Sequence, residues 1–187
     1  MANQSNLANP GPLGLMGFGM TTVLLNIHNA GFFPVTPTAV VAMGIFYGGL
    51  AQIIAGILEY RKNNTFGVTA FTSYGFFWLT LVSIWYLPTS SHTVETDKVF
   101  LGIYLAMWGI FTAFMFIGTL KANRALQFVF ASLTLLFALL AFGNITQNAA
   151  VLKFAGFEGI ICGASAIYLA MAEVINEQFG HRVLPIG

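Results

Sequence analysis

The chain has 187 residues, of which 57% are hydrophobic and 7% are charged, and its formal net charge is +1. Soluble domains carry about 25% charged residues, so this composition excludes a water-soluble globular protein. It predicts instead that residues 1–187 form a single membrane domain. Because Cys162 is the only cysteine, an intrachain disulfide and a cysteine-based metal site are excluded as well.

Six apolar runs follow one another, each close to the length of about 20 residues that crosses a hydrocarbon core of about 30 Å. We predict six transmembrane helices, at about residues 13–29, 38–59, 66–87, 99–120, 125–143 and 152–175. Residues 1–12 form a tail and the start of the first helix, and residues 176–187 form a second tail. The strands of a β-barrel alternate over about ten residues, whereas these runs are unbroken, so the predicted class is all-α.

The lysines and arginines are unevenly divided between the two sides that these helices define. Five lie on one side: Arg61, Lys62, Lys121, Arg124 and Arg182. Only Lys98 and Lys153 lie on the other side. Because cytoplasmic loops retain positive charge, both the N-terminal and the C-terminal tail are predicted to be cytoplasmic.

The first helix starts with the stretch Asn-Pro-Gly-Pro-Leu-Gly-Leu at residues 9–15. A first turn tolerates two prolines because their missing N–H groups cost little there, and Asn9 is able to cap the helix. The remaining N–H groups and the positive end of the helix dipole would suit an anion. The candidate substrate-binding residues here are Asn9, Pro10, Gly11, Pro12, Leu13, Gly14 and Leu15. The alternative, favoured by helix chemistry alone, is that Pro and Gly only start the helix cleanly.

Neutral polar side chains mark the first, third and fifth predicted helices. Thr21 and Thr22 lie on the first helix. A stripe of hydroxyls that includes Thr72 lies on the third, and Asn144 lies at the end of the fifth. A single hydroxyl is weak evidence because it often bonds to its own backbone. Three such helices in alternation favour a polar route through the bundle, and these residues join the candidate binding set.

A faint repeat of about sixty residues places an asparagine before each odd-numbered helix, at Asn9, Asn64 and Asn123. At nearly equal distances after them come Phe18, Tyr74 and Leu133. Three helix pairs around a pseudo-threefold axis would put these large side chains at one depth. An apolar ring of this kind resists wetting and is able to gate a pore. Chance matching in so biased a composition is the alternative.

Four motifs in the same order resemble the acetate uptake transporter family, and together they extend over essentially the whole chain. They are residues 9–15, Gly-Val-Thr-Ala-Phe-Thr-Ser-Tyr-Gly-Phe-Phe-Trp at 67–78, Phe-Leu-Gly-Ile-Tyr at 100–104 and Ile-Cys-Gly-Ala-Ser-Ala-Ile-Tyr at 161–168. One position departs from the family signature, which usually has Ala where this chain has Gly11. The exchange adds backbone freedom beside Pro12 but should not abolish the helix start.

The resemblance implies a six-helix, channel-like carrier of acetate and succinate whose uptake is coupled to protons. It also implies a homohexamer in the inner membrane of a bacterium, with a pore within each protomer. The narrow apolar gate of the family maps onto Phe18, Tyr74 and Leu133. The expected partners are therefore acetate, succinate, protons and the lipid bilayer, without nucleic acid, metal or cofactor.

The mechanism must move a small carboxylate without a lysine or arginine near the centre of any predicted helix. In one route the anion passes between helix N-termini, Thr and Asn side chains and Tyr74. In the other it takes up a proton and crosses the ring as the neutral acid. Glu158, early in the sixth helix, is the candidate for a proton relay, and the alternative is a boundary carboxylate near Lys153.

Two other classes of function are weaker. The Asn-Pro-Gly at residues 9–11 is similar to the Asn-Pro-Ala of water channels, which suggests a pore for water or small neutral solutes. Those channels carry the signature twice, whereas this chain has one copy. An enzyme is not expected, because the sequence has no metal-ligand cluster, no Ser-His-Asp set that the topology would bring together and no Gly-rich phosphate loop.

Overall fold

A computed structural model of the protein describes residues 7–87, 89–91 and 93–187. Its helices are α1 (Gly11–Asn29), α2 (Thr38–Ile45), the π-helix η1 (Phe46–Ala51), α3 (Gln52–Tyr60), α4 (Thr65–Tyr86), α5 (Lys98–Thr119), α6 (Arg124–Ile145) and α7 (Ala149–Phe179). Since α2, η1 and α3 follow one another without a break, the helices form six runs along the chain. The predicted tail at residues 1–12 lies partly outside the described residues.

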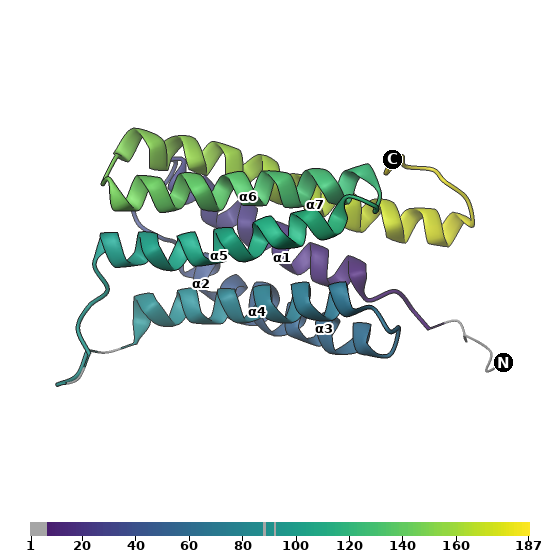
Figure 1. The fold of residues 1–187 in the computed structure, drawn as a ribbon, viewed down its shortest axis with the longest axis horizontal. Helices are drawn as coiled ribbons and strands as arrows, with labels where there is room; N and C mark the ends of the chain where they lie inside the picture. Colours follow the sequence, from purple (N-terminus) through teal and green to yellow (C-terminus); the bar gives the residue numbers. More distant parts are fainter. Residues whose placement is uncertain (1–6, 88, 92) are drawn as a thin grey trace.

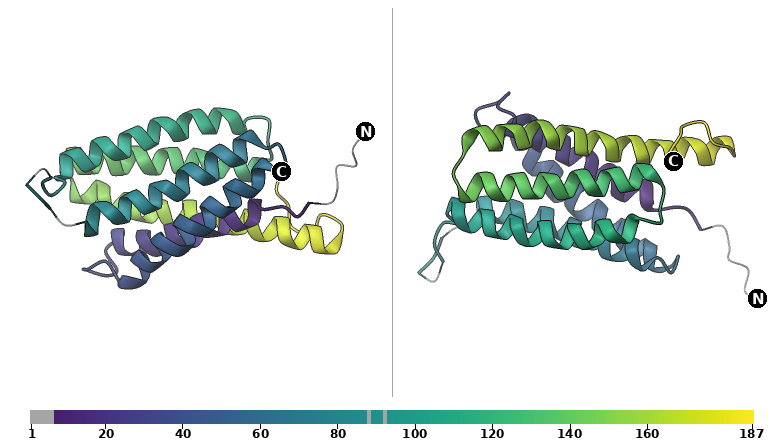
Figure 2. Two further views of the ribbon diagram at one scale, coloured as in Figure 1. Left: turned by 90° about the horizontal axis from the view of Figure 1, so that it is seen from below. Right: turned by 45° about the horizontal axis from the view of Figure 1, so that its top comes forward.

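The six runs lie side by side as one bundle, each running opposite to the one before it (Figure 1). Each run packs against the next in chain order, and α7 returns to pack against α1, so the runs close into a ring. The contact between α4 and α5 is the sparsest in this ring. The start of α1 and the end of α7 lie at the same end of the bundle, which we call the terminal end (Figures 1 and 2).

Five of the helical runs are long and apolar enough to cross a membrane: α2–η1–α3, α4, α5, α6 and α7. The sequence analysis predicted six, and α1 does not reach this standard because its 19 residues include four glycines and several polar side chains. More than half of the α1 residues are buried inside the bundle, chiefly against α7 and the α2–η1–α3 run. A helix that is shielded by its neighbours need not be as apolar as one that faces lipid.

Asparagine and aspartate side chains start the later helices. Asn64 Oδ1 accepts a hydrogen bond from Gly67 N at 3.1 Å, and Asp97 Oδ1 accepts one from Phe100 N at 2.7 Å. The helices α6 and α7 begin in the same way, at Asn123 and Asn148. These oxygens satisfy N–H groups that the first turn of a helix leaves without a partner.

Glycine allows α1 and α7 to approach closely. A Cβ atom at Gly19 would lie 2.7 Å from the carbonyl oxygen of Gly163, and a Cβ atom at Gly163 would lie 2.7 Å from that of Gly19. Facing small residues of this kind let membrane helices make close backbone contact. The pair therefore holds α1 in the centre of the bundle.

The outer face of α5 is strongly apolar and exposed. Its exposed side chains include Phe100, Met107, Ile110, Phe114 and Ile117. A soluble protein rarely leaves so many large apolar side chains in contact with water. The face fits a lipid environment or the surface of a neighbouring subunit.

Candidate functional site

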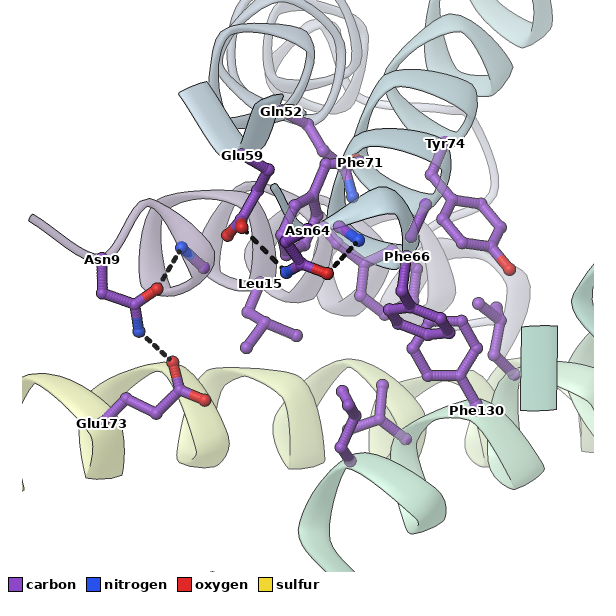
Figure 3. A pocket seen from close by; sticks show the side chains of 17 residues that line it. Asn9, Leu15, Gln52, Glu59, Asn64, Phe66, Phe71, Tyr74, Phe130 and Glu173 are labelled. Carbon is purple, nitrogen blue, oxygen red and sulfur yellow. Dashed lines mark hydrogen bonds between the residues drawn. The ribbon is translucent and has the colours of Figure 1, made fainter. Parts of the chain in front are cut away.

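A pocket opens at the terminal end of the bundle between α1, α3, α4, α6 and α7, and we call it the vestibule (Figure 3). Its empty volume, counted out to the open mouth, is about 680 Å³. The mouth carries the polar side chains Asn9, Glu59, Asn64 and Glu173. The interior is apolar and is lined mainly by Leu15, Phe66, Ala70, Phe71, Leu126, Val129 and Phe130. A small polar molecule thus meets charge first and hydrocarbon after it.

The predicted gate residues close the inner end of the vestibule. The vestibule is lined by residues of α1, α4 and α6 up to a certain depth from the terminal end. The deepest lining residue is Phe18 on α1, Tyr74 on α4 and Leu133 on α6. Their side chains are 6%, 3% and 3% exposed, and the Phe18 and Tyr74 ring centroids are 6.3 Å apart. The structure therefore brings the three residues together on one wall, and their role as a gate remains a prediction.

A second pocket lies beyond these residues, toward the opposite end of the bundle. Its empty volume is about 1000 Å³, and it is lined by residues that include Leu25, His28, Phe77, Leu81 and Asn144. It shares no lining residue with the vestibule, although both are lined by α1, α4 and α6. Two hollows thus lie on either side of the predicted ring.

The hydroxyl of Tyr74 forms a hydrogen bond with a side chain of α5. It donates a hydrogen bond of 2.9 Å to Thr112 Oγ1, and Thr112 in turn donates one of 2.7 Å to the Trp108 carbonyl. The sequence analysis counted Tyr74 among the groups that could hand an anion along. Because the hydroxyl hydrogen of Tyr74 is already used in this bond, Tyr74 presents its aromatic ring to the proposed substrate route and not a hydrogen-bond donor.

Asn9 joins three parts of the vestibule mouth. Its Oδ1 accepts hydrogen bonds from Gly11 N at 3.2 Å and from Lys62 Nζ at 2.8 Å, while its Nδ2 donates to Glu173 Oε2 at 3.0 Å. Asn64 repeats the pattern, because its Oδ1 caps α4 and its Nδ2 donates to Glu59 Oε2 at 2.8 Å. Two asparagines of the predicted repeat thus each accept from a backbone N–H at a helix start and hold a carboxylate, although the N-cap of α1 is Pro10 and not Asn9 as expected from the sequence.

The start of α1, predicted as an anion site, already faces a carboxylate of the protein. A Cβ atom at Gly11 would lie 3.3 Å from Glu173 Oε2. A negative side chain near a helix N-terminus is favourable because of the helix dipole. Glu173 therefore occupies the position that the sequence analysis assigned to a substrate anion.

The rest of the predicted signature has mixed placements. Gly11 and Leu15 line the vestibule, whereas Pro12 is buried in α1 and Gly14 packs tightly against the Phe71 ring. Pro10 and Leu13 lie on the other side of the tail, in a shallow groove beside Lys62. Most of this stretch therefore fixes how α1 starts, and only part of it faces the pocket.

The predicted hydroxyls do not line the vestibule. Thr21 is fully buried and donates a 2.7 Å hydrogen bond to Gly17 O, its own backbone. Thr22 is buried too, and its hydroxyl oxygen has no hydrogen-bond partner. Thr72 packs against Gly56 of α3. Of this candidate set only Asn144 reaches a pocket, the second one, where its Nδ2 donates to the Leu140 carbonyl at 2.8 Å.

Gln52 lines the vestibule, and the sequence analysis did not propose it as a binding residue. It follows directly after η1, whose wider turn changes the direction in which the next side chains point. A regular α-helix would place Gly44, Gly48 and Gln52, which are four residues apart, on one face. In the structure Gly44 faces Val82, Gly48 lies against Thr21, and Gln52 faces the pocket. The sequence feature that could have identified Gln52 as a pocket residue is a glutamine inside an otherwise apolar run.

Glu158 lies between α6 and α7, where Ser132 Oγ donates a short hydrogen bond to its Oε1. Its Oε2 is buried without a hydrogen-bond partner. The hydrogen-bond partner of Glu158 is thus Ser132 and not Lys153, and both the proton relay and the boundary carboxylate stay predictions. Glu158 is not among the residues that line either pocket.

Within the described ranges, no group of three or more His, Cys, Asp or Glu side chains is arranged to hold a metal ion. The polar and aromatic groups that line the vestibule are two carboxylates, amides and aromatic rings.

The sequence profile of the GPR1/FUN34/yaaH family matches residues 1–186. The chain belongs to this family. It is 67% identical to the succinate-acetate/proton symporter SatP of Escherichia coli strain K12 over 98% of this chain and 97% of that protein. Acetate permease A of Emericella nidulans is 34% identical over 96% of this chain and 66% of its own, longer sequence.

A solved structure described as the bacterial acetate channel SatP has the same fold. It superimposes with a TM-score of 0.94 at 68% sequence identity, covering 97% of this chain and all of that one. These relatives of the GPR1/FUN34/yaaH family are named as a symporter, a permease and a channel, not as enzymes. The helical bundle described above is thus that of a multi-pass membrane transport protein.

Proposed function

We propose that this protein carries acetate and succinate across the inner membrane of a bacterium, with uptake coupled to protons, as a channel-like transporter. The observation that carries the proposal is the near full-length similarity to SatP, at 67% identity. The geometry supports it, since two hollows are arranged along the bundle on either side of Phe18, Tyr74 and Leu133.

The proposed route runs within one protomer from the second pocket, past the ring, into the vestibule. Phe18, Tyr74 and Leu133 form the narrow gate, which is apolar and favours dehydrated or neutral solutes. Polar candidates along the route with a place in a pocket include Asn9, Gln52 and Asn144. The repeated arrangement of Asn9 and Asn64 supports a pseudo-threefold relation between the helix pairs.

The terminal end is proposed to be cytoplasmic. Arg61, Lys62, Lys121 and Arg182 lie in connections or tails at that end, and Arg124 is the first residue of α6 there. We also propose assembly as a homohexamer, for which the exposed apolar face of α5 offers one contact surface. Glu158 remains a proposed proton relay, because a buried carboxylate in a membrane helix is a functional candidate.

The test is uptake of radiolabelled acetate into liposomes that contain the purified protein, with and without an inward proton gradient. The wild type should take up more acetate than empty liposomes and should respond to the gradient. Phe18→Ala, which widens the ring, should change the rate. Flux equal to that of empty liposomes, in a preparation shown to be folded, would contradict acetate transport and favour a pore for water or small neutral solutes.

A further inference from the structure

Two carboxylates line the vestibule without a cation bound to either. Glu59 is 2% exposed and Glu173 is half-buried, and each accepts a hydrogen bond from an asparagine amide. In the described part of the chain neither forms an ion pair with lysine or arginine. Lys62, the cation near this site, donates to Asn9 instead. A buried carboxylate without a paired cation is unfavourable when it is charged.

A third group on the same wall also lacks a partner. Gln52 is 1% exposed, and its Oε1 is buried with no hydrogen-bond partner. The side chain reaches from the start of α3 into the vestibule, on the same side as Glu59 (Figure 3). The Nε2 of the same amide has no hydrogen-bond partner either and remains accessible from the pocket, so Gln52 adds a donor that suits the carbonyl oxygen of an acid.

Beside these amides the vestibule offers two carboxylates, Glu59 and Glu173, which accept hydrogen bonds and carry negative charge when ionised. An acetate or succinate anion has only acceptor oxygens, and two carboxylates would repel it. A neutral carboxylic acid has an O–H group that is able to donate to an amide or a carboxylate oxygen. Of the two forms of one substrate, the wall matches the protonated form.

Resting on the proposed function, we propose that substrate arrives in the vestibule as the neutral acid and that Glu59 or Glu173 removes its proton there. In this step the acid O–H bond breaks and a carboxylate O–H bond forms on the protein, leaving the substrate as the anion. The protein carboxyl group then loses the proton to water at the open mouth. The step needs no other reactant.

This proton transfer favours movement of the substrate in one direction, from the ring toward the mouth of the vestibule. The anion formed beside the remaining negative charge is repelled toward the mouth and away from the apolar ring. The same charge keeps anions at the terminal end from moving back toward Phe18 and Tyr74. The charged groups whose fields act on Glu173 are Lys62, Glu59 and Glu177, and Lys62 at the mouth attracts the departing anion.

The experiment uses full-length protein in liposomes with potassium and valinomycin, so that an inside-positive potential is set without a proton gradient. Radiolabelled acetate uptake above that of empty liposomes is measured for the wild type, Glu59→Gln, Glu173→Gln and the double variant. Glutamine keeps an oxygen that accepts from Asn64 or Asn9 but carries no charge. Glu177→Gln, an exposed residue on the same helix as Glu173 and outside the pocket, is the matched control.

The wild type and Glu177→Gln should respond to the proton gradient and ignore the potential, because the neutral acid carries no charge through the ring. The double variant should let the anion approach, so its potential-driven uptake should rise roughly tenfold, as expected for a unit charge about 10 Å away at an effective dielectric constant of about 20. If Glu59→Gln does not fold, Glu173→Gln alone should show part of the rise.

A transporting wild type whose potential response is unchanged in the folded Glu173→Gln and double variants would overturn the proposal. Absence of acetate uptake in the wild type itself is a different result, because it contradicts the proposed function and not the assignment of the proton.

Discussion

Replacing Tyr74 by Phe removes one oxygen atom from the predicted gate and leaves the ring in place. The hydroxyl donates to Thr112 Oγ1 at 2.9 Å, and Thr112 keeps its own bond to the Trp108 carbonyl when Tyr74 loses its hydroxyl. No buried donor is left without a partner, so the cost should be that of one neutral hydrogen bond, about 1 kcal/mol. For a chain of this size that lowers the thermal midpoint by about 2–4 °C.

The same variant should transport almost as the wild type does. The ring closes the vestibule by its bulk, and its hydroxyl is turned toward α5, so acetate flux into liposomes should stay within about twofold of the wild type. Tyr74→Ala, by contrast, removes the ring that lies 5.4 Å from Phe111 and 6.3 Å from Phe18 and should raise flux and weaken size selection. A drop of tenfold or more in Tyr74→Phe, with folding intact, would show that the hydroxyl handles the substrate itself.

Three further predictions concern the ring, the buried carboxylate and the central helix contact. Leu133→Ala should widen the ring and raise the ratio of succinate to acetate flux; an unaltered ratio would count against Leu133 lining the gate. If Glu158 relays protons, Glu158→Gln should lower proton-coupled uptake, and unchanged coupling in the pH-gradient assay would remove it from the mechanism. Gly163→Ala would place a Cβ 2.7 Å from Gly19 O and should destabilise the bundle by about 1–3 kcal/mol in thermal unfolding. Gly118→Ala, whose Cβ would come no closer than 3.3 Å to a neighbouring side chain, is the control and should cost less.

The helices could be predicted from the sequence because length and hydropathy are local properties of the chain. All six helical runs overlap the predicted stretches, and the asparagine before α4 caps that helix as local chemistry suggests. The largest difference is in α7 (Ala149–Phe179), which begins before and ends after the predicted residues 152–175 and includes the start of the predicted tail at 176–187. The π-helix could not be predicted, since it depends on how Gly48 and Gly49 pack against neighbouring helices. The weaker apolar character of α1 was misjudged because burial among other helices, which the sequence does not show, compensates for it.

The apolar part of the candidate site was easier to predict than its polar part. Phe18, Tyr74 and Leu133 were predicted from a repeat together with the family resemblance, and a repeat indicates depth along a helix; all three line one pocket, while their gate role stays a prediction. Which way a polar side chain points depends instead on the exact phase of its helix and on its partners. Thr21 was expected on the route but bonds to its own backbone, whereas Gln52 was passed over and faces the pocket.

The backbones of α4 and α5 make few close contacts, so the hydrogen bond between Tyr74 and Thr112 has a structural role as well. The two helices are joined by side chains, with Thr80 and Tyr104 hydroxyls 2.7 Å apart toward one end and Tyr74 bonded to Thr112 deeper in the bundle. A residue of the predicted gate thus also links α4 to α5, two helices whose backbones approach least closely in the ring and are joined by aromatic side chains. Any sideways shift of α5, whether caused by lipid or by an adjoining subunit, would pull on Tyr74 and alter the width of the passage.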